Sequence, residues 1–285
     1  MSSIFSFLFK ISRFRFWIYT GGTYVVGYAL AANTFTDFMQ MEYYIYLFYF
    51  FFLANIFIYG VNDLWDEDTD ELNPKKDEME HRLQKSEKLR LKFSIYLILG
   101  ISIILMYTQS WGERFIFSGF LLLSYFYSAP PLRFKERPIL DFSSNYLYVM
   151  PGIFAYYLVA GQLPTWIILL AAYCHVSAMH IFSAIPDIEY DRVTGIITTP
   201  VYFGKKVGLY LVLMFWIILA VIAIYLSGYH LLSFLVLVFP AFPFILIIKP
   251  SVDIRKLYWY LPYVNIILGG LLFLALINYK IFNWI

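Results

Sequence analysis

Long apolar runs separated by short polar segments dominate the chain. A helix that crosses a membrane needs about 20 mostly apolar residues, and nearly charge-free runs of this kind recur along the whole sequence. By that criterion they predict about nine transmembrane helices, at residues 16–32, 43–61, 93–109, 115–129, 139–160, 165–185, 207–227, 229–248 and 257–279. We therefore expect an all-α, polytopic membrane protein whose helices form a single bundle.

Two of the apolar stretches are too long for one helix and contain turn signals. The segment AGQLP at residues 160–164 and the segment SGYH at residues 227–230 both contain residues that favour turns. We expect one helix to end and another to begin at each of them.

The composition fits a chain whose solvent is lipid. Hydrophobic residues make up 61% of the 285 residues and charged residues only 14%, whereas a soluble domain carries about 25% charged residues. The net charge is only +2, and the basic residues are scattered over several loops, which argues against a nucleic-acid partner. Cys174 is the only cysteine, so an internal disulfide is excluded.

Lysine and arginine are distributed very unevenly between the two sides of the predicted bundle. If successive helices alternate in direction, every lysine and arginine except Arg114 and Lys280 falls on the same side. The positive-inside rule makes that side cytoplasmic. We expect a multi-pass protein of a prokaryotic cell membrane, with its N-terminus in the cytoplasm and its C-terminus outside.

An acidic cluster, VNDLWDEDTDELNPKK at residues 61–76, directly follows the second apolar run. If the helix continues into it, Asn62, Asp66 and Asp70 lie one turn apart on one stripe, with Asp63 beside them. Carboxylates at this spacing repel one another, so they do not stabilise a helix. The cluster therefore indicates a functional role and not a contribution to helix stability.

A second acidic cluster, PDIEYDRVTG at residues 186–195, occupies the matching cytoplasmic end of the sixth predicted helix. Within it, Asp187 and Asp191 are separated by one helical turn. Two facing sets of oxygen ligands would suit Mg²⁺, which keeps several waters and is commonly completed by substrate phosphates. The alternative is that the acidic residues are simply solvated in loops, as most runs of charged residues are. The matching positions of the clusters favour the metal site.

The positions of the clusters also suggest how the chain is organised. Each cluster ends the second helix of a set of four, which predicts two pseudo-repeat halves at about residues 1–130 and 131–248, followed by a ninth helix. We expect all 285 residues to form one intramembrane domain.

The two clusters resemble the paired motifs of the UbiA superfamily of membrane prenyltransferases. NDLWDEDTD is similar to the family motif N-D-x-x-D-x-x-x-D, and DIEYD is similar to its second motif, D-x-x-x-D. The resemblance implies that the motif residues bind Mg²⁺ and, through it, the diphosphate of an isoprenyl donor. Carried over by position, the metal ligands are Asn62, Asp63, Asp66, Asp70, Asp187 and Asp191. Of these, Asp66, Asp187 and Asp191 are the expected catalytic residues.

Longer segments resemble the branch of this family that elongates lycopene in C50 carotenoid synthesis. They are YSAPPLRFKERPILDFSSNYLYVMPG at residues 127–152 and AIPDIEYDRVTGIITTPVYFG at residues 184–204. This resemblance implies transfer of an isoprenyl group, here dimethylallyl, to a hydrophobic acceptor such as lycopene through an allylic carbocation.

Several polar and basic residues near the motifs are candidates for binding the substrate. The set comprises Asn62, Lys76, Arg82, Tyr127, Arg133 and Lys135. For Arg133 and Lys135, an equally good interpretation is that they only anchor the topology, because the positive-inside rule alone accounts for such loops.

Other polar residues are assigned structural roles. Asp141 begins the fifth predicted helix, where an acidic residue is an ordinary helix cap. Cys174, His175 and His180 do not have the i, i+4 spacing of a shared metal site.

Two alternative functions remain open. An aromatic-acceptor prenyltransferase of quinone or menaquinone synthesis is one, because the DIEYDR segment also resembles naphthoate-accepting members of the family. A cation-coupled transporter is the other, although its acidic residues would line a pathway near the membrane midplane. The predicted helices are nearly free of ionisable residues, which disfavours transport. The sequence does not identify the acceptor.

Overall fold

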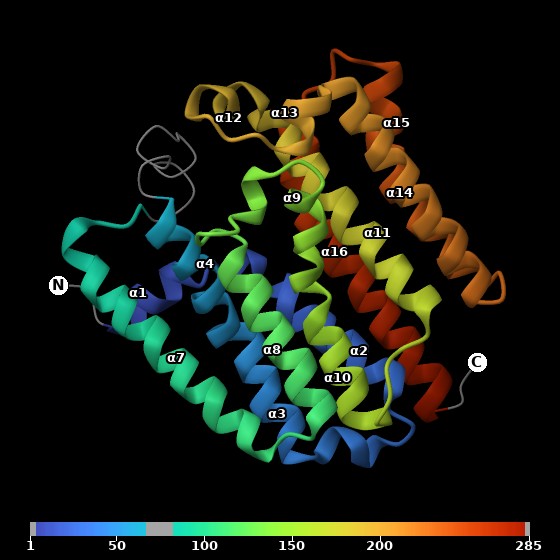
Figure 1. The fold of residues 1–285 in the computed structure, drawn as a ribbon. Helices are drawn as coiled ribbons and strands as arrows, with labels where there is room; N and C mark the ends of the chain where they lie inside the picture. The colour runs from blue at the N-terminus through green and yellow to red at the C-terminus, as the bar shows by residue number, and fades with distance from the viewer. Residues whose placement is uncertain (1–3, 67–81, 283–285) are drawn as a thin grey trace. The chain divides into compact units, whose positions relative to one another are not determined.

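The computed structural model describes residues 4–66 and 82–282, and these residues form helices joined by short loops (Figure 1). No β-strand occurs in either described range. The expectation of an all-α fold is therefore confirmed. Asp70 and Lys76 lie outside the described residues.

The chain divides into two compact units. The first comprises Met1–Arg133, Met150–Leu163 and Leu271–Ile285, and the second comprises Phe134–Val149 and Pro164–Gly270. The expectation of one domain built from two pseudo-repeat halves stays a prediction.

Helices of the first unit come from three separate stretches of the chain. They are α1 (Ile4–Ile11), η1 (Phe14–Phe16), η2 (Ile18–Gly22), α2 (Thr23–Ala31), η3 (Phe35–Met39), α3 (Met41–Phe48), η4 (Tyr49–Leu53), α4 (Ala54–Trp65), η5 (Lys85–Glu87), α7 (Lys88–Thr108), α8 (Trp111–Phe126), α10 (Met150–Ala160) and η10 (Asn278–Phe282).

The second unit contains the remaining helices. They are η6 (Phe134–Glu136), α9 (Leu140–Ser143), η7 (Ser144–Tyr148), α11 (Trp166–Ala184), η8 (Ile185–Asp187), α12 (Ile188–Thr194), α13 (Thr199–Phe203), α14 (Lys205–Leu226), η9 (Leu231–Leu237), α15 (Val238–Ile248) and α16 (Ile254–Ile277). The last turns of α16 belong to the first unit.

Six continuous helical segments of the described chain are long and apolar enough to cross a membrane. They are Met41–Trp65, Lys85–Thr108, Trp166–Thr194, Lys205–Leu226, Leu231–Ile248 and Ile254–Phe282. The other three predicted spans coincide with shorter helices, so the number nine stays a prediction. With so many apolar helices, the chain is a multi-pass membrane protein.

Both predicted turns between helices are confirmed. Gly161 follows α10 with a φ of 66°, and Gly228 follows α14 with a φ of 62°. Glycine adopts these left-handed conformations without the steric cost that a side chain would impose. Each apolar stretch is therefore divided where the sequence contains its turn signal.

The fifth predicted span is not one continuous helix, so that expectation is wrong. Residues 139–160 form α9, then the 3₁₀ segment η7, and only then α10. The side chains of Ser144 and Asn145 both donate to the carbonyl of Asp141, at 3.3 and 2.6 Å. Such side-chain bonds compete with the regular backbone ladder of an α-helix, which accounts for the interruption.

Aromatic side chains fill much of the core of the first unit. Tyr46 lies 4.6 Å from Phe154 between ring centroids, and Phe50 contacts Phe117 and Phe154 at 6.0 and 5.7 Å. The hydroxyl of Tyr46 accepts a hydrogen bond from Gln109 at 2.9 Å. These rings join α3, η4, α8 and α10 into one packed layer.

Helices α2 and α10 approach each other through two glycines. A Cβ atom at Gly27 would overlap the carbonyl oxygen of Gly152, and one at Gly152 would lie 2.8 Å from the carbonyl oxygen of Thr23. Small residues allow this closeness between membrane helices, where van der Waals packing drives association.

The second unit has its own apolar core. Phe182 of α11, Trp216 of α14 and Phe242 of α15 are buried together, and Leu261 of α16 completes the cluster. This packing holds the end of α11, from which the second acidic motif continues.

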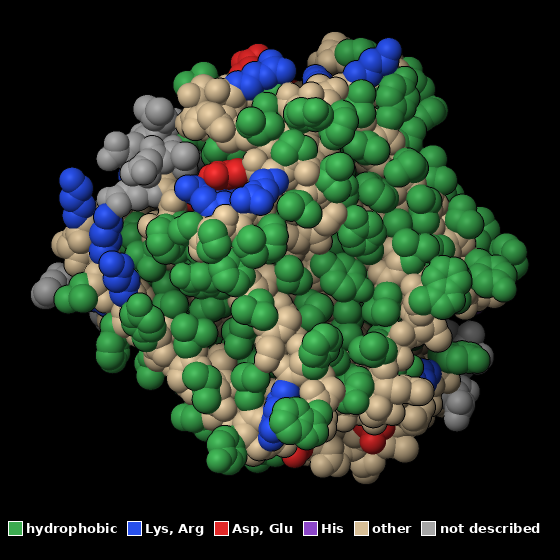
Figure 2. All heavy atoms as spheres, in the orientation of Figure 1, with side chains coloured by type: hydrophobic (Ala, Val, Ile, Leu, Met, Phe, Trp, Pro, Cys, Tyr) green, Lys and Arg blue, Asp and Glu red, His purple; other side chains and the backbone are tan. Residues whose placement is uncertain are grey.

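Hydrophobic side chains cover most of the face shown in Figure 2. Many of them are large and exposed, including Tyr107, Trp111 and Phe115, each of which is more than 80% exposed. A soluble protein rarely shows such extensive apolar surface, which agrees with a lipid environment.

The close contact of α2 with α10 predicts a strong effect of one methyl group. We expect Gly27→Ala to destabilise the protein by about 1–3 kcal/mol, the usual cost of overpacking, because the backbone of Gly152 leaves no room. Gly100→Ala is the matched control, since a Cβ atom at Gly100 would have nothing within 4 Å. Thermal unfolding of the purified proteins in detergent measures both, and equal melting temperatures for the two variants would contradict the packing.

The predicted orientation can be measured with single cysteines in a Cys174→Ser background. Thr36 and Lys85 are both exposed. Thr36 lies in a segment predicted to be outside, and Lys85 lies in a segment predicted to be cytoplasmic. In intact cells, a membrane-impermeant maleimide should label Thr36→Cys, and it should label Lys85→Cys only after permeabilisation. Labelling of both variants in intact cells would exclude the predicted topology.

Candidate active site

The first acidic motif lies at the end of α4. Asp66 follows the last residue of the helix, and its backbone N–H donates to the carbonyl of Asn62 at 3.0 Å. One turn separates the two residues, so their side chains meet and the Asn62 amide donates to Asp66 Oδ2. The predicted alignment of Asn62 with Asp66 is therefore observed.

The turn after α8 contacts the same place through Ser128 and Arg133. Ser128 Oγ accepts a hydrogen bond from the Asn62 amide at 2.9 Å. The guanidinium of Arg133 lies 3.8 Å from Asp66 Oδ1. The structure thus brings Asn62, Asp66 and Arg133 together, three of the residues predicted from sequence. Sequence reasoning missed Ser128, although this serine lies in the YSAPP segment, next to the candidate Tyr127.

Asp63 contacts a different partner. Its Oδ1 accepts a 2.7 Å bond from the guanidinium of Arg13, which also lies 4.7 Å above the ring of Tyr59. In the sequence, Arg13 is only one of many cytoplasmic basic residues, so its contact with the motif was not predicted. The role of Asp63 as a metal ligand stays a prediction.

Both arginines that reach the first motif have unusual backbone conformations. The φ of Arg13 is 50° and that of Arg133 is 40°, in the left-handed region, where a non-glycine residue costs about 1–3 kcal/mol. Asp63 and Asp66 are only 2% and 4% exposed. Buried carboxylates need a compensating charge or donor, and these two arginines supply one to each.

The other predicted substrate-binding residues are distributed between the units. Tyr127 lies beside Ser128 and is half-buried, and Arg82 is half-buried at the first described position after the gap. Lys135 lies in η6 of the second unit and is also half-buried. Their contacts with a substrate stay predictions.

The second acidic motif begins where α11 ends. Pro186 and Asp187 lie in the short η8, which joins α11 to α12. Asp191 is buried, and its Oδ2 accepts a 3.3 Å bond from the hydroxyl of Thr198. Asp187 is half-buried. The sequence pattern alone did not predict the contact of Thr198.

A tight turn returns the chain after Asp191. Helix α12 ends at Thr194 and is followed by Gly195, which has a φ of 77°, and the N–H of Ile196 donates to the carbonyl of Asp191 at 2.8 Å. Glycine allows this left-handed helix end without the steric cost of a side chain. Thr198 is thereby returned to the Asp191 carboxylate, and α13 begins at the next residue.

Asp141 does not cap its own helix, so that expectation is wrong. Helix α9 has no side-chain cap. The fully buried carboxylate of Asp141 instead accepts bonds from the N–H of Thr199, at 2.7 Å, and from its hydroxyl. His180 Nε2 lies 3.7 Å from the same carboxylate. Asp141 therefore caps α13, a helix 58 positions away along the chain.

Two histidines of α11 have different partners. His180 lies near Asp141, whereas His175 Nε2 is 3.1 Å from Asn265 Oδ1 on α16. The amide of Asn265 in turn donates to the sulfur of Met179 at 3.4 Å. His175 thus belongs to a polar contact between α11 and α16.

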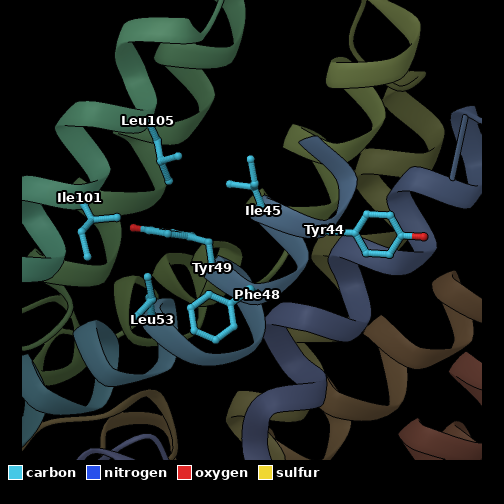
Figure 3. A pocket seen from close by; sticks show the side chains of 7 residues that line it. All are labelled: Tyr44, Ile45, Phe48, Tyr49, Leu53, Ile101 and Leu105. Atoms are coloured by element: carbon cyan, nitrogen blue, oxygen red, sulfur yellow. The ribbon is translucent and has the colours of Figure 1, made fainter. Parts of the chain in front are cut away.

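A groove in the first unit is remote from the acidic motif. It has a volume of about 450 Å³ and is lined by Tyr44, Ile45, Phe48, Tyr49, Leu53, Ile101 and Leu105. Tyr49 points from its helix toward Ile101 and Leu105 (Figure 3), and its hydroxyl is hydrogen-bonded to Ser102 at 2.7 Å. Asp66 follows 17 residues later in the chain, roughly 25 Å along a helix. The groove is therefore not the site of the acidic chemistry.

Comparisons with known proteins agree with the motifs and the fold. A family model described as the UbiA prenyltransferase family matches residues 21–261. A lycopene elongase/hydratase from Haloferax volcanii is 37% identical over 272 residues, which cover 94% of this chain and 88% of that protein.

The fold is also similar to solved structures of a UbiA homologue from Archaeoglobus fulgidus. The form bound to GPP and Mg²⁺ aligns with a TM-score of 0.74 at 21% identity, covering 95% of this chain and 99% of the other. The form bound to DMAPP and Mg²⁺ aligns with a TM-score of 0.72 at 20% identity, covering 94% and 99%. The chain belongs to the UbiA prenyltransferase family.

Proposed function

We propose that this prenyltransferase transfers a dimethylallyl group from its diphosphate to lycopene or a related carotenoid, with Mg²⁺ as cofactor. The observation that carries the proposal is the convergence of Asn62, Asp66 and Arg133 at the end of an apolar helix. This arrangement offers oxygen ligands for a cation and a guanidinium for an anion at one place. The 37% identical lycopene elongase/hydratase supports the choice of substrate.

The residues of the motifs fit a hard divalent cation. Asn62 and Asp66 supply oxygen atoms one helical turn apart, and oxygen is the ligand that Mg²⁺ prefers. Among residues 4–66 and 82–282, no three acidic, histidine or cysteine side chains are grouped to hold a metal ion. We assign the remaining ligands to Asp70, Asp187 and Asp191, following the family motifs, with Asp63 as a further candidate.

The cofactor supplies charge neutralisation of the diphosphate leaving group when it is bound. Arg133 adds a guanidinium, which can form two parallel hydrogen bonds with phosphate oxygens. Ser128 accepts one of the amide hydrogens of Asn62 and so restricts that side chain. Lys76, Arg82, Tyr127 and Lys135 are proposed as further contacts with the diphosphate.

The reaction begins when the bond between C1 and oxygen of the donor breaks and diphosphate leaves with the electron pair. The terminal alkene of the acceptor then forms a new carbon–carbon bond with the allylic cation. The resulting tertiary cation either loses a proton or takes up water and releases a proton. An apolar helical interior suits these steps because it keeps water away from the cation.

The contacts of two basic residues favour a hydrocarbon acceptor. A buried carboxylate on an aromatic acceptor would need a cationic partner. Within the described residues, Arg114 and Lys280 are the arginine and the lysine on the predicted outer side, and both already have partners. Arg114 donates to the carbonyls of Met106 and Tyr107, and Lys280 donates to the carbonyl of Leu30 at 2.7 Å. The cytoplasmic arginines and lysines could serve, but they are also the expected contacts of the diphosphate. A polyene needs no such partner.

The proposed metal ligands predict inactive but folded variants. Asp66→Ala and Asp187→Ala should each lower turnover by at least about a hundredfold, the order of loss when one group that stabilises the reacting charge is removed. Size-exclusion chromatography and thermal unfolding should show a folded protein. Product formation in detergent or in membranes is the measurement.

Glu189 provides a matched control within the second motif. It lies on the same short helix as Asp191 but is exposed. Glu189→Ala should keep most of the activity. Near-normal turnover in Asp66→Ala or Asp187→Ala would exclude these carboxylates as metal ligands.

The acceptor is tested directly by mass spectrometry of the products. Purified protein with Mg²⁺ and dimethylallyl diphosphate should add one or two C5 units to lycopene, and chelation by EDTA should stop the reaction until Mg²⁺ is restored. A parallel reaction contains 4-hydroxybenzoate and a polyprenyl diphosphate. Product from the aromatic pair alone would replace the carotenoid assignment by quinone synthesis and leave the prenyltransferase activity intact.

A further inference from the structure

A chain of contacts in the second unit connects Asp141 with the second acidic motif. The carboxylate of Asp141 holds the N–H and the hydroxyl of Thr199. The preceding residue, Thr198, donates its hydroxyl to Asp191 Oδ2 at 3.3 Å. Three residues separate Thr198 from the end of α12 at Thr194. A buried carboxylate is thus connected to a motif carboxylate through two adjacent threonines.

Thr199 is held from a second direction. Its hydroxyl accepts a 2.7 Å bond from the N–H of Ile139. Ile139 has a φ of 73°, which is a genuine outlier for a β-branched residue. The segment before α9 therefore adopts a strained conformation while it contacts Thr199. Ile139, which precedes α9, and Asp141, which lies within it, therefore both hydrogen-bond to Thr199.

Burying the carboxylate of Asp141 costs free energy. Asp141 is fully buried, and a buried charge is tolerated only when donors or opposite charges compensate it. Here the carboxylate accepts two hydrogen bonds from Thr199, and His180 Nε2 lies 3.7 Å away. Serine, threonine or asparagine could also cap a helix such as α13, and these residues carry no charge that must be buried. The stronger acceptor fixes the start of α13 more firmly.

We propose that Asp141 is a positioning residue for the second acidic motif: it fixes Thr199, and through the adjacent Thr198 it orients the carboxylate of Asp191. Groups that hydrogen-bond to metal ligands determine how those ligands are presented. The consequence, which rests on the function proposed above, is that Asp141 controls the affinity for Mg²⁺ and the donor diphosphate without contacting either.

The experiment compares Thr198→Val with Thr198→Ser. Valine has nearly the shape of threonine but lacks the hydroxyl that contacts Asp191, whereas serine keeps it. Isothermal titration calorimetry measures binding of dimethylallyl diphosphate at several Mg²⁺ concentrations, with no acceptor present. Thr198→Val should weaken Mg²⁺-dependent donor binding by about tenfold, the lower end of the loss seen when a partner of a metal ligand is removed. Thr198→Ser should bind like the wild type.

Asp141→Ala should produce the same change as Thr198→Val if both act along one path. The double variant should then be no weaker than the weaker single variant, because the effects of residues in one network do not add. In turnover assays, the Mg²⁺ concentration for half-maximal rate should rise while the KM for the acceptor stays unchanged. If Asp141→Ala does not fold, Asp141→Asn takes its place, because asparagine keeps an acceptor oxygen but removes the negative charge, and the pair Thr198→Val and Thr198→Ser tests the contact with Asp191.

Asp37→Ala is the control for general destabilisation. Asp37 accepts bonds from the N–H groups of Asn33 and Thr34, at 2.8 and 3.0 Å, in a loop of the first unit. Its loss should lower the melting temperature and leave donor binding unchanged.

Four results would overturn the proposal. They are unchanged donor binding in a folded Asp141→Ala, unchanged donor binding in Thr198→Val, equal loss in Thr198→Ser, and multiplied losses in the double variant. Because the binding assay contains no acceptor, failure to alkylate lycopene contradicts only the acceptor. Absence of Mg²⁺-dependent donor binding in the wild type would contradict the proposed function itself and this inference with it.

Discussion

A carboxylate can remain buried at the end of an apolar helix only if donors or cations replace the water it has lost. Three aspartates of this protein meet that condition in three ways. Asp63 pairs with Arg13, Asp66 lies near Arg133, and Asp141 accepts bonds from Thr199. Each partner comes from a distant part of the chain, so each buried charge also fixes a loop or a short helix. The local geometry of the first acidic motif and the position of the start of α13 follow from these contacts.

The helices that carry the motifs are held by packing of a different kind. Gly27 and Gly152 let the backbones of α2 and α10 approach, while aromatic rings fill the rest of the first unit. In the second unit, Trp216 and its neighbours fix α11. Rigid helices with polar ends are a suitable support for a reaction that needs charged groups beside a dry, apolar interior.

Much of the fold could be predicted because membrane helices leave a strong and continuous signal. The run before Asn62 and the turns at Gly161 and Gly228 were all evident from sequence. The interruption at Ser144 and Asn145 was not, because side-chain bonds to the carbonyl of Asp141 do not alter the hydrophobic pattern.

Within the candidate site, the i, i+4 spacing of Asn62 and Asp66 follows from helix geometry. In contrast, the contacts of Arg13 and Ser128 join residues 50 and 66 positions apart. No local pattern encodes such a separation. Asp141 illustrates the same limit, since a sequence shows that an aspartate can cap a helix but not which helix it caps.

The 3.8 Å approach of Arg133 to Asp66 means that the site is already internally compensated. Under the proposed function, a cation would compete with the guanidinium for this carboxylate, and a diphosphate would compete with the carboxylate for this guanidinium. Binding would then be an exchange of partners, whose free energy is the difference between two paired states. A cation and a diphosphate that arrive together would give Asp66 and Arg133 one new partner each, whereas a diphosphate alone would draw the guanidinium away from the buried Asp66 carboxylate. Such an arrangement would favour the metal–diphosphate complex over its separate parts.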